Sequence, residues 1–287
     1  MSEYKCKAKS NYLNLRGLNF HYLEWGNQEN PLVIMLHGYM DHAHSFDLLA
    51  DKLSENYHLI AWDARGFGQS EHIHPYAYYY FFDYIFDLEL FINHFTDQPV
   101  ILLGHSMGGI IASFYSGTYP QKVSKMINLE GWFLSDYPFS EAAGKAKVWM
   151  EGVKNLKGFK PMKDIEEAKL RLLRTDTMTP EDFALHLAEK CTIEKDGFLI
   201  WSHDPLHRTR SPQQTYYGQI KSFLENIECP VLLMQGDKTF FELKKYEQNL
   251  ELYRNSERIE IFDAGHNLHI HKPDEISDLI IKFLEKP

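Results

Sequence analysis

The chain alternates short, continuous runs of apolar residues with longer segments whose apolar residues recur at helical spacing. Because polar residues rarely interrupt the runs, the runs predict strands that are buried on both faces, as in a parallel sheet covered by helices. Most runs end at a glycine or an acidic residue. The runs are residues 32–36, 58–62, 100–103, 123–129, 231–234 and 259–262.

The segments between the runs predict helices at residues 46–54, 76–95, 108–118, 240–253 and 273–284. Strands that alternate with helices are typical of an α/β fold with a doubly wound, mostly parallel sheet. Two earlier segments, residues 12–15 and 19–25, alternate apolar and polar residues more regularly and are separated by a short turn. We therefore expect them to form an antiparallel hairpin at the edge of the sheet.

The alternation of strands and helices breaks down between about residues 132 and 227, where the sequence is charged and helical in character. An unstructured loop of this length inside a compact domain is implausible. We therefore expect a helical cap, residues 132–227, inserted into a core formed by residues 1–131 and 228–287.

Composition narrows the possible classes of protein. Of 287 residues, 44% are hydrophobic and 24% are charged, which excludes a disordered chain. Lys and Arg number 30 against 40 Asp and Glu, a net charge of −10 that argues against a nucleic-acid partner. No apolar run approaches the roughly 18 residues of a membrane helix, so we expect no membrane insertion.

Cysteine and histidine usage bears on location and metal binding. The N-terminal ten residues lack an apolar segment, and the three cysteines are widely spaced, so we expect a cytoplasmic protein with free thiols. The 15 histidines include several close pairs, but none lies in an HExxH or mixed Cys/His pattern. The sequence therefore predicts neither a metal site nor a cofactor.

One short motif carries candidate chemistry: residues 104–109 are Gly-His-Ser-Met-Gly-Gly. The motif follows an apolar run and begins a predicted helix, the context in which G-x-S-x-G forms a tight strand-to-helix turn. Glycines on both sides of Ser106 allow close approach of the chain segments, and the turn exposes the hydroxyl. The helix N-terminus offers a free N–H to a developing oxyanion.

Three further segments occur in a matching order. His37-Gly38-Tyr39 follows the first apolar run, Asp-Ala-Arg-Gly-Phe-Gly-Gln-Ser at residues 63–70 follows the second, and Ala264-Gly265-His266 follows the last. Together with the serine motif, they resemble the α/β-hydrolase superfamily over everything except the cap. Residues 196–205 and 227–233 are similar to the serine hydrolase-like subgroup of that superfamily.

The resemblance implies a role for each motif. Ser106 would be the nucleophile, and His266 would be the base that takes its proton and later protonates the leaving group. The backbone N–H groups of Tyr39 and Met107 would form the oxyanion hole. An Asp nucleophile would indicate epoxide or haloalkane chemistry, whereas serine predicts acyl transfer to water.

The acid that would complete the triad is open. The family usually places it at the third position after the glycine that ends the run at 231–234, and here that position is Thr239. Asp237, two residues earlier, is one alternative. We favour Glu130, which ends an apolar strand, because a carboxylate is costly to bury there unless it is paired. Asp263 is the weakest candidate.

Several other polar residues receive secondary expectations. His269 and His271 lie close to His266 and remain alternatives for the base. Asp63 and Arg65 are expected to be structural turn residues, and His37 is expected to orient the oxyanion turn.

Aromatic residues make up 14% of the chain, and ten of them fall within residues 76–95. Helical spacing predicts that Phe82 and Phe86 pack on the sheet. The dense cluster from Tyr76 to Tyr80 is expected to be partly exposed or to contact the cap. Trp132 and Phe133 follow the favoured acid, so they either shape a substrate pocket or hold the cap to the core.

The sequence therefore predicts a serine hydrolase, carboxylesterase-like, that acts on a small acyl substrate with an apolar part. Amide, lactone, thioester and C–C bond hydrolysis are rivals, because the same triad serves all of them. A ligand-binding, receptor-like protein with a weakened triad is the alternative from another class, motivated by the threonine at position 239. Nothing in the sequence indicates the oligomeric state.

Overall fold

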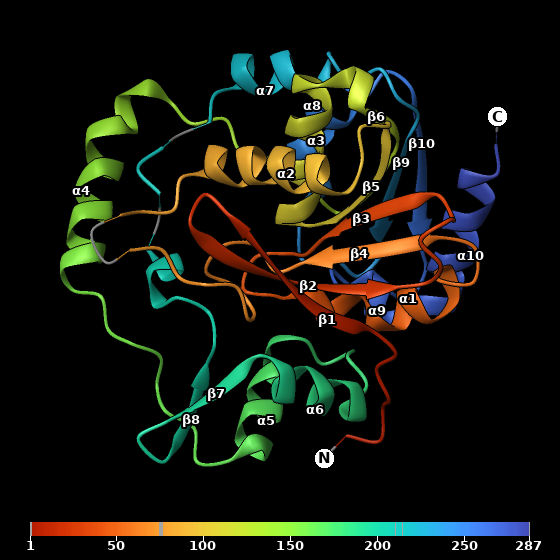
Figure 1. Cartoon of the computed structure of the whole chain (residues 1–287). Coiled ribbons are helices and arrows are strands. Elements are labelled where there is room, and N and C mark those ends of the chain that lie inside the picture. Colours follow the sequence, from red (N-terminus) through yellow and green to blue (C-terminus); the bar gives the residue numbers. More distant parts are fainter. Residues whose placement is uncertain (1, 75–76, 210, 214, 287) are drawn as a thin grey trace.

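A computed structural model of the chain describes residues 2–74, 77–209, 211–213 and 215–286. Within these residues, the main sheet has eight strands in the spatial order β1-β2-β4-β3-β5-β6-β9-β10 (Figure 1). The strands are β1 (Lys9–Leu15), β2 (Leu18–Trp25), β3 (Leu32–Leu36), β4 (His58–Trp62), β5 (Val100–His105), β6 (Val123–Leu129), β9 (Val231–Gly236) and β10 (Ser256–Ile261).

The pairing of the strands is mostly parallel. β1 and β2 form an antiparallel hairpin at one edge, and β2 also runs antiparallel to β4. Every other neighbouring pair in the main sheet is parallel. This topology confirms the predicted α/β class and the edge hairpin, and it puts the C-terminal ends of β3, β5, β6 and β9 at the same edge of the sheet.

Successive residues of the central strands pack against opposite faces of the sheet. On β3, Ile34 and Leu36 belong to the core beneath α2 and α3, whereas Val33 and Met35 belong to the core beneath α1, α9 and α10. Burial on both faces is why the strand sequences are continuously apolar. The helices are α1 (Asp47–Leu53), α2 (Phe81–Phe95), α3 (Met107–Thr118), α9 (Leu268–His271) and α10 (Pro273–Leu284).

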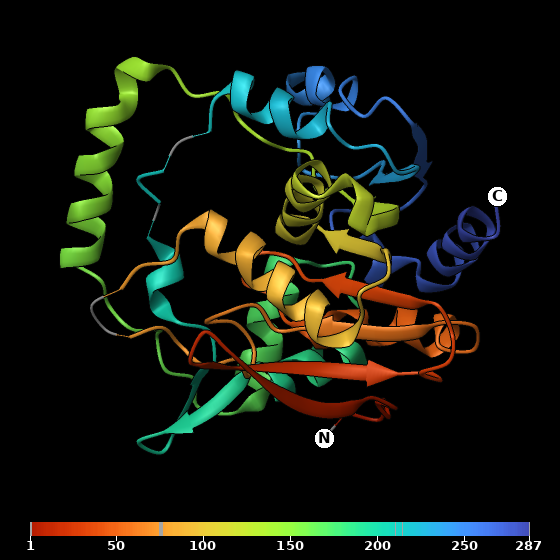
Figure 2. The ribbon, with the colours of Figure 1, turned by 45° about the horizontal axis from the view of Figure 1, so that its top comes forward.

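Between β6 and β9 the chain leaves the sheet and forms the inserted elements. Figures 1 and 2 show α4 standing apart at one side, while α5, α6 and the β7–β8 hairpin lie together near the edge strands β1 and β2. The inserted elements are α4 (Ala142–Lys154), α5 (Ile165–Thr175), α6 (Glu181–Lys190), β7 (Thr192–Lys195), β8 (Phe198–Trp201) and α7 (Tyr217–Leu224).

Two features of this insertion differ from the sequence prediction. The insertion is not purely helical, because β7 and β8 pair as an antiparallel hairpin. Its turn, Asp196-Gly197, has positive φ at both residues (52° and 79°), a conformation that Asp-Gly favours in tight hairpins. In addition, α7 packs on the core helix α3, where the Phe223 ring stacks on Phe114 at 4.4 Å, although it lies within the predicted cap range.

Two predicted helices are shorter than expected. The helix predicted at 240–253 is reduced to α8 (Glu247–Leu250), preceded by a single 3₁₀ turn at Leu243–Tyr246. Phe240 and Phe241 lie instead in the loop that approaches His266. The helix predicted from residue 76 begins at Phe81, and Tyr76 lies outside the described residues.

The aromatic residues of α2 correct a prediction about packing. Phe82 and Phe86 are exposed, by 36% and 51%, whereas Tyr84 and Phe91 are buried. Tyr84, Leu88 and Phe91 recur at helical spacing and form the buried stripe, so the prediction selected the wrong face of the helix. The aromatic cluster that precedes α2 contacts the insertion as expected, since the Tyr79 hydroxyl donates a hydrogen bond to Asp204 at 2.9 Å.

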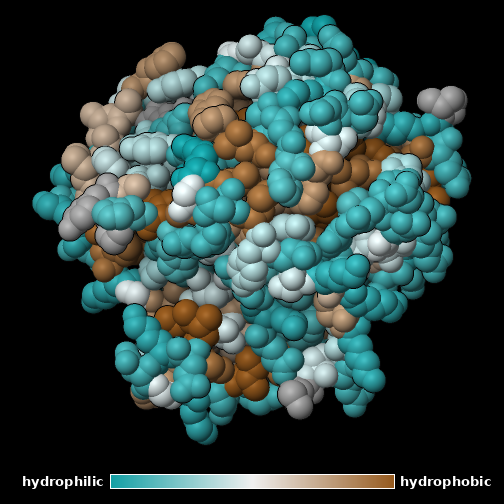
Figure 3. Space-filling model, viewed as in Figure 1, coloured by the Kyte–Doolittle hydropathy of each residue, from teal (hydrophilic) through white to brown (hydrophobic). Residues whose placement is uncertain are grey.

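The surface is mainly hydrophilic, with hydrophobic residues gathered in separate patches. Figure 3 shows one such patch over the region of β7, β8 and α5. Ile193 and Phe198 of the hairpin are about half exposed. In the described part of the chain, no helix has the length and apolar character needed to cross a membrane.

Asp63, which follows β4, is the centre of a buried turn. Its carboxylate accepts hydrogen bonds from the backbone N–H groups of Ala43 (2.7 Å) and Gln69 (2.8 Å) and from Nδ1 of His21 (2.7 Å). Burial alone would raise the pKa of Asp63, but the hydrogen bond and charge interaction with His21 hold it well below its usual value. Arg65 pairs with the buried Asp87 on α2. Both residues therefore have the structural role that the sequence predicts.

Asp63→Asn is expected to lower the free energy of unfolding by about 3 kcal/mol, since the amide cannot accept from every donor and leaves buried groups unpaired. Urea denaturation at pH 7 measures the change, and Asp97→Asn, at an exposed position, is the control. Because the folded pKa is lowered, the contribution of Asp63 is present above an unfolded pKa of about 3.9. It is lost as the pH falls towards the folded pKa, so the difference between wild type and variant shrinks in acid. An equal loss in both variants would refute this role.

Candidate active site

Ser106 lies at the sharp turn between β5 and α3, with backbone angles of φ 51° and ψ −117°. A positive φ is unusual for a residue with a side chain, and such strain is typical of functional sites. The turn is held by a hydrogen bond from the Ser106 N–H to the carbonyl of Leu129 at 2.8 Å. A Cβ added to Gly104 or Gly108 would overlap neighbouring backbone atoms, so both positions require glycine.

The structure brings Glu130 together with His266. Nδ1 of His266 lies 2.7 Å from Oε2 of Glu130, whose side chain is fully buried, while the histidine side chain is 15% exposed. Because a carboxylate only accepts, this contact places the proton on Nδ1 and leaves Nε2 with its lone pair. In the described residues, no hydrogen bond engages Nε2 of His266, so this nitrogen is available to take a proton.

Two further donors bind the Glu130 carboxylate. The backbone N–H of Gly236 donates to Oε1 at 2.8 Å, and the hydroxyl of Thr239 donates to Oε2 at 2.7 Å. Thr239 thus stands at the position where the family resemblance leads us to expect the acid, and it instead binds an acid that follows another strand. The sequence does not reveal this arrangement, because the two residues are far apart in the chain.

The other acidic candidates are held elsewhere. Asp237 accepts the backbone N–H of Ala264 at 3.1 Å, so it supports the loop that carries His266 but does not bind the imidazole. Asp263 pairs with Lys238 and Lys272 and is about half exposed. Of the acids weighed from the sequence, only Glu130 reaches His266.

The two alternative histidines are also placed away from that carboxylate. His269 is fully buried in α9, and burial lowers its pKa to about 3. His271 binds Asp176 of the insertion at 2.8 Å and accepts the backbone N–H of Gly265 at 3.0 Å. An acid in the insertion therefore positions the loop just before His266, a connection that the sequence does not reveal.

The predicted oxyanion turn follows β3. Nε2 of His37 accepts the N–H of Ala64 at 3.0 Å, and its Nδ1 donates to the carbonyl of Gly38 at 2.7 Å, which fixes the turn as expected. Met107 is the first residue of α3, and neither its N–H nor that of Tyr39 has a partner in the described residues. Both N–H groups are free to bind an oxyanion.

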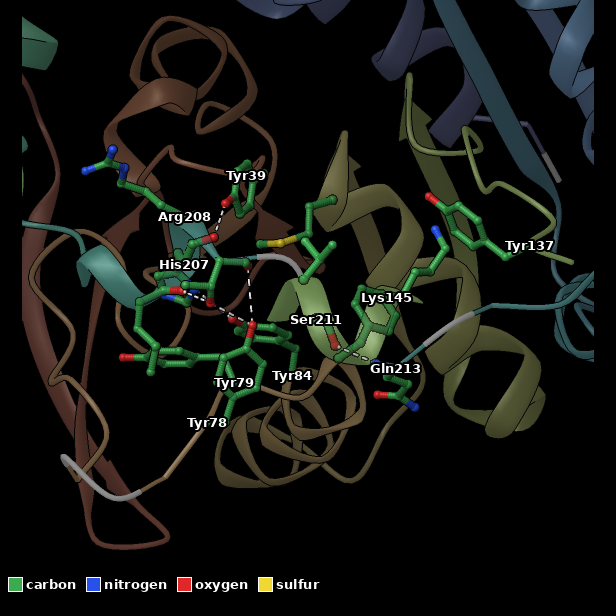
Figure 4. Close-up of a pocket in the computed structure, with 15 residues that line it drawn as sticks. Tyr39, Tyr78, Tyr79, Tyr84, Tyr137, Lys145, His207, Arg208, Ser211 and Gln213 are labelled. Atoms are coloured by element: carbon green, nitrogen blue, oxygen red, sulfur yellow. Dashed lines mark hydrogen bonds between the residues drawn. The ribbon is translucent and has the colours of Figure 1, made fainter. Parts of the chain in front are cut away.

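A cavity of about 720 Å³ adjoins this turn. Tyr39 and Met107 are in its lining, together with side chains from the start of α2 and from the insertion. Figure 4 shows Tyr78, Tyr79 and Tyr84 near His207, with Tyr137 and Lys145 across the cavity. The Tyr39 hydroxyl donates a hydrogen bond to the carbonyl of His207.

Trp132 and Phe133, expected either to shape a substrate pocket or to hold the cap to the core, do not line this cavity. Trp132 is buried in the core, and its carbonyl accepts a hydrogen bond from Asn249 at 3.0 Å. Phe133 stacks on Phe241 at 3.8 Å, and Phe241 in turn lies 5.1 Å from the His266 ring. The two residues therefore hold the loop before α8 against the core, since the chain turns inward directly after Glu130.

Comparison with known proteins agrees with this geometry. A family model described as alpha/beta hydrolase fold matches residues 31–273. Human serine hydrolase-like protein 2 is 33% identical over 289 residues, which cover 91% of this chain and 89% of the relative. A putative esterase/lipase of Haemophilus influenzae is 26% identical over 287 residues, which cover 99% of this chain and 92% of the relative.

The structural comparison gives the same fold. The thioesterase domain from a curacin biosynthetic pathway has a TM-score of 0.87 and 25% identity, and the match covers 96% of this chain and 99% of that domain. The sequence match spans the strands that carry Tyr39, Ser106 and Glu130 and the loop that carries His266. The chain therefore belongs to the α/β-hydrolase fold family and to its serine hydrolase-like subgroup.

Proposed function

We propose that the chain is a serine hydrolase, carboxylesterase-like, that cleaves a carboxylic ester or a related acyl substrate through an acyl-enzyme. The observation that carries the proposal is the 2.7 Å contact between His266 and the buried Glu130, on loops that lie at the same sheet edge as the strained Ser106. A serine hydroxyl alone is a poor nucleophile and needs a base. An imidazole whose Nδ1 is held by a carboxylate supplies that base.

In the first half of the reaction, Ser106 Oγ attacks the carbonyl carbon of the substrate while Nε2 of His266 takes the hydroxyl proton. The carbonyl oxygen becomes an oxyanion, which the backbone N–H groups of Tyr39 and Met107 stabilise. Glu130 stabilises the imidazolium that forms. The imidazolium then protonates the leaving alcohol, and the acyl group remains on Ser106.

In the second half, His266 takes a proton from water, and the hydroxide oxygen attacks the acyl-enzyme. The second tetrahedral intermediate collapses, the acid leaves, and the proton on His266 returns to Ser106. Each half therefore uses the same base and the same oxyanion hole.

The cavity supports a substrate with an apolar part. Its volume of about 720 Å³ and its tyrosine-rich lining, with Phe81, Val148 and Leu206, suit a small organic acyl or alcohol group. An ester is the first choice, while thioester, amide, lactone and C–C substrates remain chemically open to the same residues.

The observation that suggested a ligand-binding protein has another explanation. That hypothesis rested on Thr239 at the usual acid position, and Thr239 donates to Glu130 instead. The cysteines Cys6, Cys191 and Cys229 are free thiols, which supports the proposal of a cytoplasmic protein.

Ser106→Ala is expected to lower kcat/KM for p-nitrophenyl butyrate at least about 10⁴-fold, because the nucleophile is removed. A fluorophosphonate probe should label the wild type and fail to label the variant. Ser116→Ala, at a buried serine of the same helix, is the control and should keep both labelling and turnover. Equal labelling of wild type and Ser106→Ala would exclude Ser106 as the nucleophile.

Glu130→Gln is expected to lower kcat by about 10³- to 10⁴-fold, since an amide cannot stabilise the imidazolium. The matched control, Asp237→Asn, should stay within about threefold of the wild type, because the Asp237 carboxylate binds a backbone N–H and not the imidazole. Steady-state kinetics on one ester decides between the two acids. Equal, small effects in both variants would rule out Glu130 as the acid.

Leu206→Trp is expected to raise KM for p-nitrophenyl octanoate at least about tenfold while leaving p-nitrophenyl acetate nearly unchanged, because the larger side chain fills the cavity. Leu206→Met conserves volume and should leave both esters unaffected. The measurement is KM for both esters in the wild type, Leu206→Trp and Leu206→Met. If octanoate and acetate respond alike, this cavity does not bind the acyl chain.

A further inference from the structure

Three imidazole nitrogens lie buried beside Ser106 without a hydrogen-bond partner in the described part of the chain. They are both ring nitrogens of His269 and Nδ1 of His105. His269 is 0% exposed and His105 is 2% exposed. Their ring centroids are 4.4 Å apart. Buried polar atoms are nearly always paired, so such a group of unpaired nitrogens points to a bound ion or water.

The carboxylate of Asp41 completes the group. One ligand atom from each of Asp41, His105 and His269 lies within 4.8 Å of the other two. Oδ1 of Asp41 accepts the N–H of His42 at 2.8 Å.

The hydrogen bonding of His105 presents a lone pair to this group. Its Nε2 lies 3.0 Å from the backbone carbonyl of His266, which can only accept, so the proton is on Nε2 and Nδ1 is unprotonated. A backbone carbonyl that fixes the tautomer in this way is the usual support of a metal-binding histidine.

The backbone leaves room in front of Nδ1. Gly38 lies next to His105, and a Cβ at that position would come within 2.9 Å of Nδ1. Glycine at this position therefore leaves the space beside Nδ1 unoccupied.

We propose that Asp41, His105 and His269 form a binding site for a divalent transition-metal ion, best fitted to Zn²⁺. Two imidazole nitrogens and one carboxylate oxygen are ligands that Zn²⁺ commonly takes, with a fourth position for water. Metal–ligand bonds of about 2.1 Å in a tetrahedron separate the ligands by about 3.4 Å, so binding requires the three side chains to draw closer. The three positions are too far apart in the sequence for ligand spacing to reveal the site, which is why the sequence predicts no metal.

The site goes beyond the proposed hydrolysis. Its ligands come from the turn after β3, the end of β5 and α9. These segments also carry Tyr39, Ser106 and the loop of His266, so a bound ion would tie together the three parts of the active site. Metal binding is therefore expected to raise the thermal unfolding temperature independently of any turnover.

The test is zinc binding by isothermal titration calorimetry on the full chain, freed of metal with a chelator. A second cluster of possible ligands, Cys6, His44 and Asp47, could bind zinc as well. Every protein in the test therefore carries Cys6→Ser, which removes the sulfur of that cluster. Co²⁺ is a second probe, because its visible d–d bands report coordination without any need for activity.

We expect the Cys6→Ser parent to bind one Zn²⁺ and to show the Co²⁺ bands. Adding His269→Phe or Asp41→Asn should weaken zinc binding at least about tenfold and abolish the bands. His269→Phe removes two unpaired buried nitrogens and keeps a ring, so it should fold, which circular dichroism verifies. His58→Phe, at a buried histidine bound to Glu24, is the matched control and should bind zinc as the parent does.

Two results would overturn the proposal. If the folded parent takes up no zinc, the buried nitrogens are met by water alone. If either His269→Phe or Asp41→Asn binds zinc with the parent's affinity, the ion lies elsewhere. Asp41→Asn conserves shape and provides the decisive variant should His269→Phe fail to fold.

Discussion

The buried carboxylate of Glu130 is the interaction on which the arrangement of the site depends. A carboxylate without solvent contact is tolerated only when its oxygens accept hydrogen bonds, and Glu130 has three donors, from Gly236, Thr239 and His266. These donors come from the end of β9, the loop that follows it and the loop before α9. One charge at the end of β6 thus fixes three segments that the sheet alone would leave as independent loops.

The backbone conformation at Glu130 directs its carboxylate into the site. Glu130 has a positive φ of 54°, and the following N–H, of Gly131, is accepted by the buried side chain of Asn128 at 2.7 Å. The strain at Glu130 is therefore balanced by a hydrogen bond from its own strand. Ser106 is strained in the same way on the neighbouring strand, and its N–H binds the carbonyl of Leu129. The two strained residues are held by adjacent strand ends.

The features that could be predicted from the sequence are those that short stretches of residues determine. Continuous apolar runs located the central strands, and the glycines around Ser106 located the strained turn. The burial cost of a charge at a strand end favoured Glu130. The role of Thr239, the hold of Asp176 on His271 and the grouping of Asp41 with His269 depend on contacts between distant segments, which no local pattern encodes. The hairpin turn at Asp196-Gly197 was missed although its sequence is typical of such turns.

The contact between the Tyr39 hydroxyl and the carbonyl of His207 joins the insertion to the turn after β3. Tyr39 belongs to the turn whose backbone N–H is proposed to bind the oxyanion, and the His207 ring stacks on Phe67 at 3.8 Å. Any displacement of the segment Pro205–Arg208 is therefore transmitted through one side chain to the geometry of the oxyanion turn. The insertion and the turn after β3 are therefore mechanically coupled through this one hydrogen bond.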